Sequence, residues 1–272
     1  MGYLTTDKKK ITAKTLLEMK AAGEKITQMT AYDFTTASII DAAGIDSILV
    51  GDSASNVMAG NQDTTPITVD QMIYHARAVV RACHHCLVVC DMPFGSYQVS
   101  REDGIRNAIR IIKETGAGAV KMEGGKEIAD TVKGIVDAGI PVIGHLGLTP
   151  QSIHKFGGYG LRAKEDTEAE KLIEDALALD AAGVSGITLE KVPAALANKV
   201  TAMVKAATIG IGAGNGTDGQ VLVYADALGM TSEFKPKFLR HFANVNKCMT
   251  EGVMEYIRCV KSESFPSEAE SY

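Results

Sequence analysis

The sequence predicts a single-domain α/β protein, a (β/α)8 TIM barrel, and three observations support this fold. The chain has 272 residues, close to the roughly 250 that a barrel of this kind needs. Short apolar segments alternate with longer segments of helical periodicity. Most of the short segments are almost continuously apolar, which is typical of strands buried on both faces of a parallel sheet. Eight strand-and-helix pairs favour a closed barrel over an open sheet.

The predicted strands are bounded by turn residues or by helical segments. They cover residues 25–31, 46–51, 86–91, 117–123, 141–146, 184–190, 207–212 and 225–229. The last two are the least distinct. Glycines that close helices shortly before a strand support the repetition, because a helix C-cap favours the left-handed conformation that glycine adopts without strain. These glycines are Gly44, Gly116, Gly139 and Gly183.

Helical periodicity separates the strands. Apolar residues recur at helical spacing in 101–115. Thr68 and Gln71 form a capping box, which predicts a helix over 69–82. An extra N-terminal helix over 12–22 precedes the first strand and is placed to cover the bottom of the barrel.

The chain boundaries and connections follow from composition. Residues 1–261 are expected to form one catalytic barrel domain, and the polar residues 262–272 a frayed C-terminal tail. The longest connection, 149–165, follows the fifth strand and is rich in glycine, so it is a candidate mobile lid.

The charge pattern argues against several classes of partner. The net charge is −5 with both signs mixed, so no basic patch indicates nucleic acid. No apolar stretch approaches the ~20 residues that span a bilayer, and the N-terminus lacks the apolar core of a secretion signal. Gly2 and Thr6 fit the short N-myristoylation pattern, but an ordinary N-terminus is the preferred interpretation.

The five cysteines indicate reduced thiols in a cytoplasmic protein rather than a disulfide framework. The run Cys83-His84-His85-Cys86 suggests zinc, but a second pair of ligands is missing.

Three carboxylates end consecutive predicted strands, where the active site of a (β/α)8 barrel lies. They are Asp52, Asp91 and Glu123. Each one alone is readily explained as a helix cap or as the partner of a nearby lysine. Together they would repel strongly in a pocket of low dielectric constant, and a hard divalent cation such as Mg²⁺ would relieve that repulsion.

Further polar residues lie on the same strand ends. Lys121 shares a face with Glu123 and could contact a substrate oxygen, or the two could form an internal ion pair. His145 lies in an apolar run, as a pocket residue or as a buried core histidine. Glu190 ends the sixth strand and is suited to general base or acid work; otherwise it is a surface residue. The glycines of 209–219 match neither a Rossmann nor a P-loop pattern; they indicate a close backbone approach to a ligand or a tight barrel corner.

Ordered motifs along the chain, from about Lys10 to Lys237, resemble those of the ketopantoate hydroxymethyltransferase family. They are LVGDS (49–53), PITVDQMIYH (66–75), DMPFGSY (91–97), AVKMEGG (119–125), GHLGLTPQS (144–152), GGYG (157–160), TLEKVP (188–193), IGIGAG (209–214) and DGQVLV (218–223).

The resemblance implies transfer of a hydroxymethyl group from the cosubstrate 5,10-methylenetetrahydrofolate to 3-methyl-2-oxobutanoate, through a Mg²⁺-stabilised enolate, in pantothenate synthesis. It implies one Mg²⁺ per subunit and a homo-oligomer, commonly a decamer. The implied roles are metal ligation by Asp52, Asp91 and Glu123, substrate contact by Asp52, Ser53, Asp91 and Lys121, and catalysis by Glu190 as proton acceptor with Lys121 and His145.

The sequence departs from the usual family pattern at three places. These are Ala54-Ser55-Asn56, Leu161-Arg162-Ala163 after Gly160, and Thr217. None is an expected ligand, but they bear on the lid and the folate contact.

Two other interpretations stay open. Isocitrate lyase-like and phosphoenolpyruvate mutase-like barrels also bind Mg²⁺ and 2-oxo acids, although the KKCGH-type loop of isocitrate lyases is absent. A catalytically inactive barrel that serves as a binding protein is disfavoured by the intact carboxylates.

Overall fold

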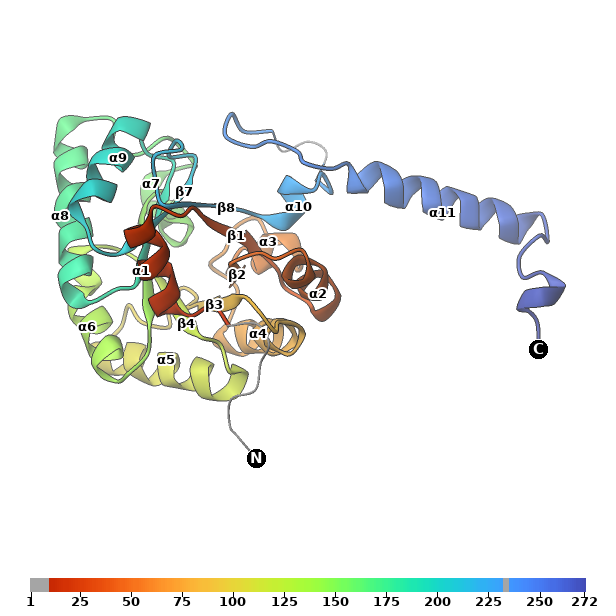
Figure 1. Ribbon diagram of the computed structural model, residues 1–272, viewed down its shortest axis with the longest axis horizontal. Coiled ribbons are helices and arrows are strands. Elements are labelled where there is room, and N and C mark those ends of the chain that lie inside the picture. Colours follow the sequence, from red (N-terminus) through yellow and green to blue (C-terminus); the bar gives the residue numbers. More distant parts are fainter. Residues whose placement is uncertain (1–9, 232–234) are drawn as a thin grey trace. The chain divides into compact units, whose positions relative to one another are not determined.

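Eight parallel strands close into a barrel in the computed structural model, which describes residues 10–231 and 235–272 (Figure 1). The strands are β1 (Ile26–Thr30), β2 (Ser47–Val50), β3 (Leu87–Asp91), β4 (Ala119–Glu123), β5 (Val142–Gly147), β6 (Gly186–Glu190), β7 (Ala207–Ile211) and β8 (Gly219–Leu222). Each strand pairs with its neighbours in sequence, and β1 also pairs with β8, so no sheet edge is left. The predicted (β/α)8 barrel is confirmed.

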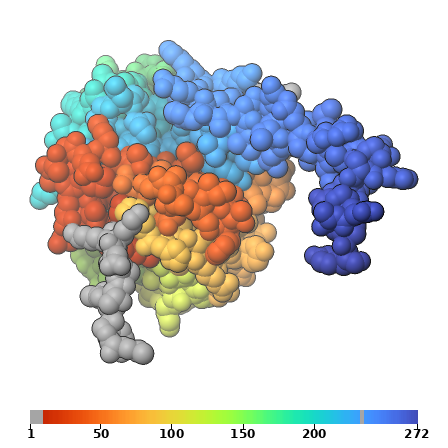
Figure 2. All heavy atoms as spheres, turned by 45° about the vertical axis from the view of Figure 1, so that its right-hand side comes forward, coloured from red at the N-terminus to blue at the C-terminus, as the bar shows by residue number. Residues whose placement is uncertain are grey.

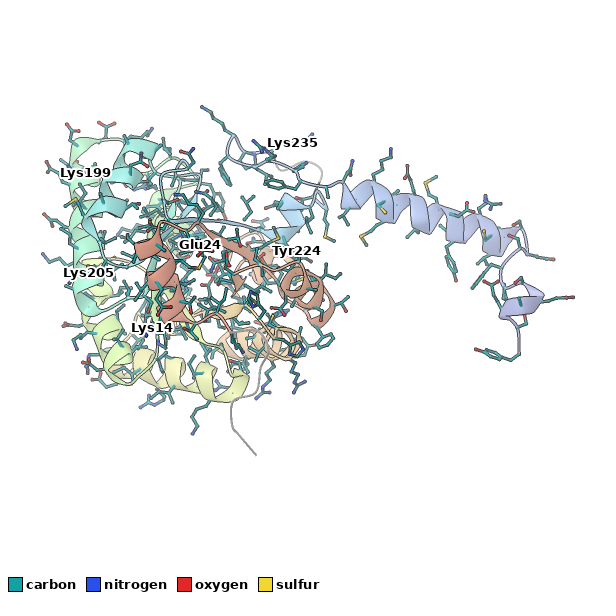
Figure 3. The ribbon with its side chains drawn as sticks, in the orientation of Figure 1. Lys14, Glu24, Lys199, Lys205, Tyr224 and Lys235 are labelled. Atoms are coloured by element: carbon teal, nitrogen blue, oxygen red, sulfur yellow. The ribbon has the colours of Figure 1, made fainter. Side chains whose placement is uncertain are left out.

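The longer helices surround the strands (Figure 1). They are α2 (Phe34–Ala42), α4 (Val69–Ala82), α5 (Arg101–Thr115), α6 (Ala129–Asp137), α8 (Asp166–Ala182) and α9 (Ala194–Met203). The capping box of Thr68 and Gln71 starts α4, as predicted. Gly116 and Gly183 end α5 and α8 with φ of 78° and 94°, a conformation that other residues rarely adopt. Charged side chains such as Lys14 and Lys199 are exposed (Figure 3).

The N-terminal helix α1 (Ala13–Ala22) covers the bottom of the barrel, as predicted. Its residues join the first residues of several strands in one apolar cluster. The cluster contains Ile11, Ala13, Leu16, Met19, Ile26, Leu49, Leu87, Val89, Ala119, Ile143, Ala207, Ile209 and Val221. Lys20 joins α1 to the segment before β7 by donating to the carbonyls of Thr201 and Ala206. In Figure 2 the red N-terminal part of the described chain lies against cyan segments from later in the sequence. Because apolar side chains fill the lower barrel, the polar site lies at the opposite mouth.

The predicted eighth strand at 225–229 is wrong. The eighth strand, β8, begins at Gly219, six residues before the predicted start. Tyr224–Ala227, within the predicted strand region, forms a helical turn, α10. Gly219, the last glycine of the 209–219 segment, explains why the strand begins earlier than predicted. It is the first residue of β8 and pairs with Ile26 of β1. A Cβ at Gly219 would lie 2.4 Å from the carbonyl oxygen of Ile26, so only glycine permits this approach. The alanine-rich segment that follows favours a helix.

The chain divides into two compact units, one ending at Leu222 and one beginning at Val223. The first contains the barrel. The second contains α10, the helix α11 (Val245–Lys261) and a short 3₁₀ turn at Glu268–Glu270. The predicted tail at 262–272 follows the end of α11, and the expectation that 1–261 acts as one domain stays a prediction.

No helix in the described ranges is long and apolar enough to cross a membrane. The myristoylation pattern at Gly2 and Thr6 lies outside the described residues. All five cysteines are free. Cys83 and Cys86 lie beside Asp41, whose carboxylate accepts the backbone N–H groups of residues 84–86. This turn is therefore explained by its hydrogen bonds without a metal.

Candidate active site

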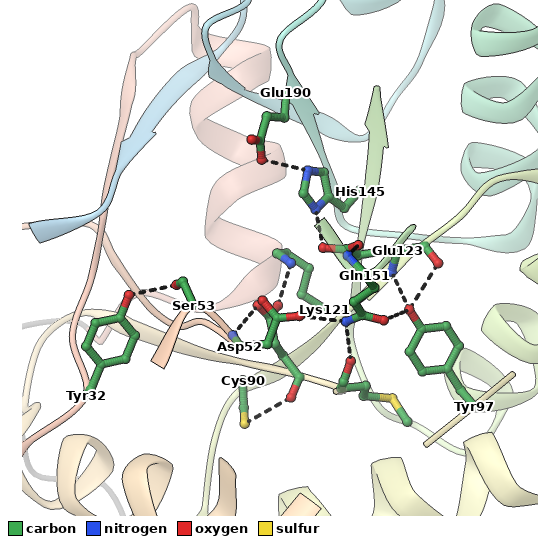
Figure 4. A network of polar contacts seen from close by, with 12 residues as sticks. Tyr32, Asp52, Ser53, Cys90, Tyr97, Lys121, Glu123, His145, Gln151 and Glu190 are labelled. Carbon is green, nitrogen blue, oxygen red and sulfur yellow. Dashed lines mark hydrogen bonds and ion pairs between the residues drawn. The ribbon is translucent and has the colours of Figure 1, made fainter. Parts of the chain in front are cut away.

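The polar side chains predicted at the strand ends meet inside the mouth of the barrel (Figure 4). Strand register brings them together, because Asp91 pairs with Lys121 on the neighbouring strand and Glu123 pairs with His145. Asp52 follows β2 and completes the group. All five side chains are deeply buried, with residue exposures between 2% and 6%. None of the three carboxylates caps a helix, so the capping explanation for them is excluded.

One half of the site is an ion pair that orders the end of β2. Lys121 Nζ lies 2.6 Å from Asp91 Oδ1, and Asp91 Oδ2 accepts the backbone N–H of Asp52 at 2.9 Å. Burial raises the pKa of Asp91 although Lys121 opposes the shift. Burial alone would lower the pKa of Lys121, but Asp91, Glu123 and Asp52 raise it above its usual range. Lys121 is therefore a permanently charged ammonium group, and its partner is Asp91, not Glu123.

Of the three buried carboxylates, Asp52 is the one whose charged form is most disfavoured. Burial raises its pKa well above the usual range, and the charges of Asp91 and Glu123 raise it further. Lys121 and the amide of Gln151 only partly compensate. An additional cation at this point would favour the charged form of Asp52.

The other half of the site is a chain of two carboxylates joined by an imidazole. His145 Nδ1 lies 3.1 Å from Glu123 Oε1, and His145 Nε2 lies 3.3 Å from Glu190 Oε2. Burial and Lys121 lower the pKa of His145, but Glu123 and Glu190 raise it to about 9. His145 and Lys121 in turn lower the pKa of Glu123, against burial. The contacts with Glu123 and Glu190 favour the charged form of His145 and make it part of the site.

Glu190 is the most accessible carboxylate of the group, with a side-chain exposure of 17%. It pairs in register with Gly147 at the end of β5 and faces His145. No partner for Glu190 could be named from the sequence, and in the structure that partner is His145. Ser53 is half-buried, and its hydroxyl lies 2.7 Å from the hydroxyl of Tyr32.

Two functional side chains were not singled out from the sequence, Tyr97 and Gln151. Gln151 donates to Asp52 and Met92, and the Tyr97 hydroxyl donates to Gln151 and accepts the backbone N–H of Glu123. Both lie in the DMPFGSY and GHLGLTPQS blocks. Block membership was the available signal, because neither side chain follows a strand directly.

The residues present suit a hard divalent cation. With every group ionised, Asp52, Asp91, Glu123 and Glu190 face one ammonium and one imidazolium, which leaves two negative charges without a partner. Carboxylate oxygens are the donors that Mg²⁺ prefers, and Mg²⁺ usually takes one or two carboxylates and keeps several waters.

The carboxylates of the site do not form a complete set of metal ligands, and Mg²⁺ does not require one because it keeps several waters. Within 10–231 and 235–272, Asp41, Cys83 and Cys86 are the only three potential ligand groups whose atoms all lie within 4.8 Å of one another. The carboxylates at the barrel mouth are spaced more widely, which leaves room for water or substrate oxygens.

A cavity of about 560 Å³ adjoins Glu123 and Gln151. The connection 149–165 forms one wall, where Arg162 stacks on the ring of Phe156 at 3.9 Å and pairs with Glu168. Arg162 belongs to one of the places where the sequence departs from the family pattern. The mobility of this connection as a lid stays a prediction.

The fold and the site together define a class: a (β/α)8-barrel enzyme with a buried cluster of carboxylates, a lysine and a histidine at the carboxyl ends of its strands. Comparison with known families is consistent with this class. The family model described as ketopantoate hydroxymethyltransferase matches residues 10–268. The chain belongs to the ketopantoate hydroxymethyltransferase family, and it is a transferase.

Similar proteins support this assignment. The chain is 60% identical to a 3-methyl-2-oxobutanoate hydroxymethyltransferase of Flavobacterium johnsoniae, over the full length of both chains. It is 57% identical to the enzyme of the same name from Bacteroides fragilis, over 100% of this chain and 99% of the other.

Solved structures with the same fold include a phosphonopyruvate hydrolase in complex with oxalate and Mg²⁺. It is 12% identical with a TM-score of 0.61, covering 96% of this chain and 93% of the other. A 2,3-dimethylmalate lyase is 15% identical with a TM-score of 0.59, covering 96% and 91%. At this identity the likeness shows the fold alone.

Proposed function

We propose that this protein transfers a hydroxymethyl group from 5,10-methylenetetrahydrofolate to 3-methyl-2-oxobutanoate and forms 2-dehydropantoate, a step of pantothenate and coenzyme A synthesis. The family assignment and the names of the relatives support the reaction. The observation that carries the proposal is the buried cluster in which the Asp52–Asp91–Lys121 group lies beside the Glu123–His145–Glu190 chain. Such a cluster suits the formation of an enolate from a small 2-oxo acid.

The proposed metal is one Mg²⁺ per subunit, held by Asp52, Asp91 and Glu123. When bound, the ion would supply Lewis-acid polarisation of the 2-oxo group. The oxygen donors and the uncompensated negative charge of the site support this assignment.

The proposed substrate contacts are Asp52, Ser53, Asp91 and Lys121. Lys121 is charged and immobilised by Asp91, so it can stabilise negative charge that develops on the 2-oxo oxygen without reorganising. Ser53 presents a hydroxyl at the edge of the cluster. The deep burial of Asp52, Asp91 and Lys121 excludes water, which strengthens each of their interactions.

The proposed base is Glu190. It takes the C3 proton of the oxo acid, and the electron pair of that C–H bond becomes the enolate. His145 Nε2 lies 3.3 Å from Glu190 Oε2, a contact that orients the Glu190 carboxylate. C3 then forms a bond to the methylene carbon of the folate, and the bonds from that carbon to N5 and N10 both break. Water supplies the hydroxyl group, and its second proton and the proton taken from C3 go to the two nitrogens. The products are 2-dehydropantoate and tetrahydrofolate, so all atoms are accounted for.

The first test is proton NMR of 3-methyl-2-oxobutanoate in D₂O with the protein and Mg²⁺. We expect metal-dependent loss of the C3 proton, followed by 2-dehydropantoate when methylenetetrahydrofolate is added. The Asp91→Ala variant should lose metal dependence and turnover together. Exchange without product would refute the folate as donor, and absence of exchange in folded, Mg²⁺-loaded protein would refute the enolising site.

The alternative is an enzyme that makes or breaks a carbon–carbon or carbon–phosphorus bond to a 2-oxo acid, as in the isocitrate lyase and phosphoenolpyruvate mutase barrels. The solved structures that share the fold belong to that group, but they support only common architecture. Turnover of 2-methylisocitrate, 2,3-dimethylmalate or phosphonopyruvate without folate would favour it.

We also propose a homo-oligomer, with a decamer as the expected size, and a cytoplasmic location. The helix α11 supports an oligomer because its apolar side chains are exposed; they include Met249, Val253, Met254, Tyr256, Ile257 and Val260. Native mass spectrometry would give the number of subunits. The five free cysteines suit a reducing compartment.

A further inference from the structure

Gln151 is the most highly connected uncharged side chain at the barrel mouth, and its residue exposure is 5%. Its amide nitrogen donates to Asp52 Oδ2 at 2.9 Å and to the carbonyl of Met92 at 3.0 Å. Its amide oxygen accepts from the hydroxyl of Tyr97 at 2.7 Å and from the amide of Gln98 at 3.2 Å. All four hydrogen-bonding positions of the side chain are therefore used, and Figure 4 shows the contacts with Asp52 and Tyr97.

The chemistry of these partners fixes which way the amide faces. The carbonyl oxygen of Met92 can only accept, so the amide nitrogen must point toward it and toward Asp52. Gln98 presents an N–H group to the other end of the amide, where only an oxygen can accept. The Asp52 carboxylate consequently has a donor in one fixed position.

The backbone of the same residue holds a second carboxylate. The N–H of Gln151 donates to Glu123 Oε2 at 2.9 Å, while Glu123 Oε1 faces His145. Glu123 is thus held from both sides. One residue of the connection after β5 therefore fixes two carboxylates that come from β2 and β4.

We propose that Gln151 is a positioning residue that orients the carboxylates of Asp52 and Glu123 toward a bound divalent cation, with Tyr97 holding its amide. This inference rests on the proposed metal site. Hydrogen bonds to the outer oxygens of metal ligands set the direction of the remaining lone pairs, and their loss commonly weakens metal binding or activity about 10–100-fold. Gln151 also belongs to the 149–165 connection, so this connection directly contacts the carboxylates of the proposed cation site.

The test substitutes Gln151→Met, which keeps the length and volume of the side chain and removes its four hydrogen bonds. We expect the dissociation constant for Mn²⁺, measured from the EPR signal of the free ion with Mg²⁺ competition, to rise about 10-fold or more. In the D₂O exchange assay, the Mg²⁺ concentration for half-maximal rate should rise in parallel. The matched control is Gln28→Met, which removes a buried amide that donates to Ser47 Oγ and to no carboxylate, and its Mn²⁺ affinity should stay within about twofold.

Tyr97→Phe provides a second variant if Gln151→Met does not fold, as judged by circular dichroism in EDTA. It removes the hydroxyl that holds the amide oxygen of Gln151, and we expect a smaller loss of Mn²⁺ affinity in the same direction. Folded variants with wild-type Mn²⁺ affinity would overturn the role of Gln151. Failure of the wild-type protein itself to bind Mn²⁺ would overturn the proposed metal site, a separate result.

Discussion

The Lys121→Met substitution tests the electrostatic account of the cluster in the metal-free protein. It removes the buried ammonium group from Asp91 and keeps most of the side-chain volume. At the observed 2.6 Å, the attraction between the two charges is about 6 kcal/mol for an effective dielectric constant near 20. Desolvation of both groups offsets part of this attraction. Removal of one partner from a buried pair typically costs about 3–5 kcal/mol.

Proton uptake by Asp91 sets a ceiling on that cost, because the unpaired carboxylate can become neutral. Taking up a proton at pH 7 costs an aspartate about 4 kcal/mol relative to its ordinary pKa near 3.9, and at pH 5 about 1.5 kcal/mol. The folded variant then binds one more proton than its unfolded chain, so its stability falls as the pH rises. We therefore expect a destabilisation of about 4 kcal/mol at pH 7 that shrinks to about 1.5 kcal/mol at pH 5.

The assay is urea unfolding in EDTA followed by circular dichroism, since the chain has no tryptophan. The matched control is Lys133→Met, which breaks the exposed pair with Asp137 on α6 and should change stability by less than about 0.5 kcal/mol. A Lys121→Met cost below about 1 kcal/mol at pH 7, or a cost that does not depend on pH, would refute the ion-pair account.

Three further predictions follow from the site and the fold. Glu190→Gln should slow C3 exchange about 100-fold or more while the variant still binds Mn²⁺, as expected for loss of a general base; unchanged exchange would remove Glu190 from that role. Because the pKa of His145 is raised to about 9, its stabilising contribution is complete below pH 6.5 and is lost as the pH rises toward 9. Urea unfolding of wild type and His145→Gln in EDTA should therefore converge over that window, and a constant difference would contradict the assignment. Gly219→Ala should destabilise the barrel by about 1–3 kcal/mol, since its Cβ would lie 2.4 Å from the Ile26 carbonyl; an unchanged melting temperature would contradict this account of barrel closure.

The sequence was sufficient for the barrel because both faces of a strand in a parallel sheet are buried, and this burial leaves a continuous apolar run. A continuous apolar run does not predict a strand in which glycine or polar residues take the place of apolar ones. Gly219 and Gln220 begin β8, and the apolar segment 225–229 resembles a strand more closely than β8 does. The position of β8 is set by its approach to β1, a contact between residues about 190 positions apart that local periodicity does not record.

The site was predictable to the extent that parallel strands end at the same edge. Asp52, Asp91 and Glu123 could be brought together by counting strands alone. The pairing of Lys121 with Asp91 could not, because it depends on strand register rather than on strand order. Gln151 was beyond reach for a further reason. It reaches the cluster from a connecting segment, and its partner Asp52 lies 99 residues away.

The charges of the site explain how one barrel architecture can serve different reactions. The neighbouring barrels share the fold at 12–15% identity, so the fold itself does not specify the chemistry. With every group ionised, the three buried carboxylates Asp52, Asp91 and Glu123 outnumber the cations Lys121 and His145 by one, and burial raises the pKa of Asp52 well above its usual range. In the proposed mechanism a divalent cation would offset this excess of negative charge. In the same proposal Lys121 would neutralise the charge that develops on the substrate, and Glu190, the most accessible carboxylate of the cluster, would accept the proton.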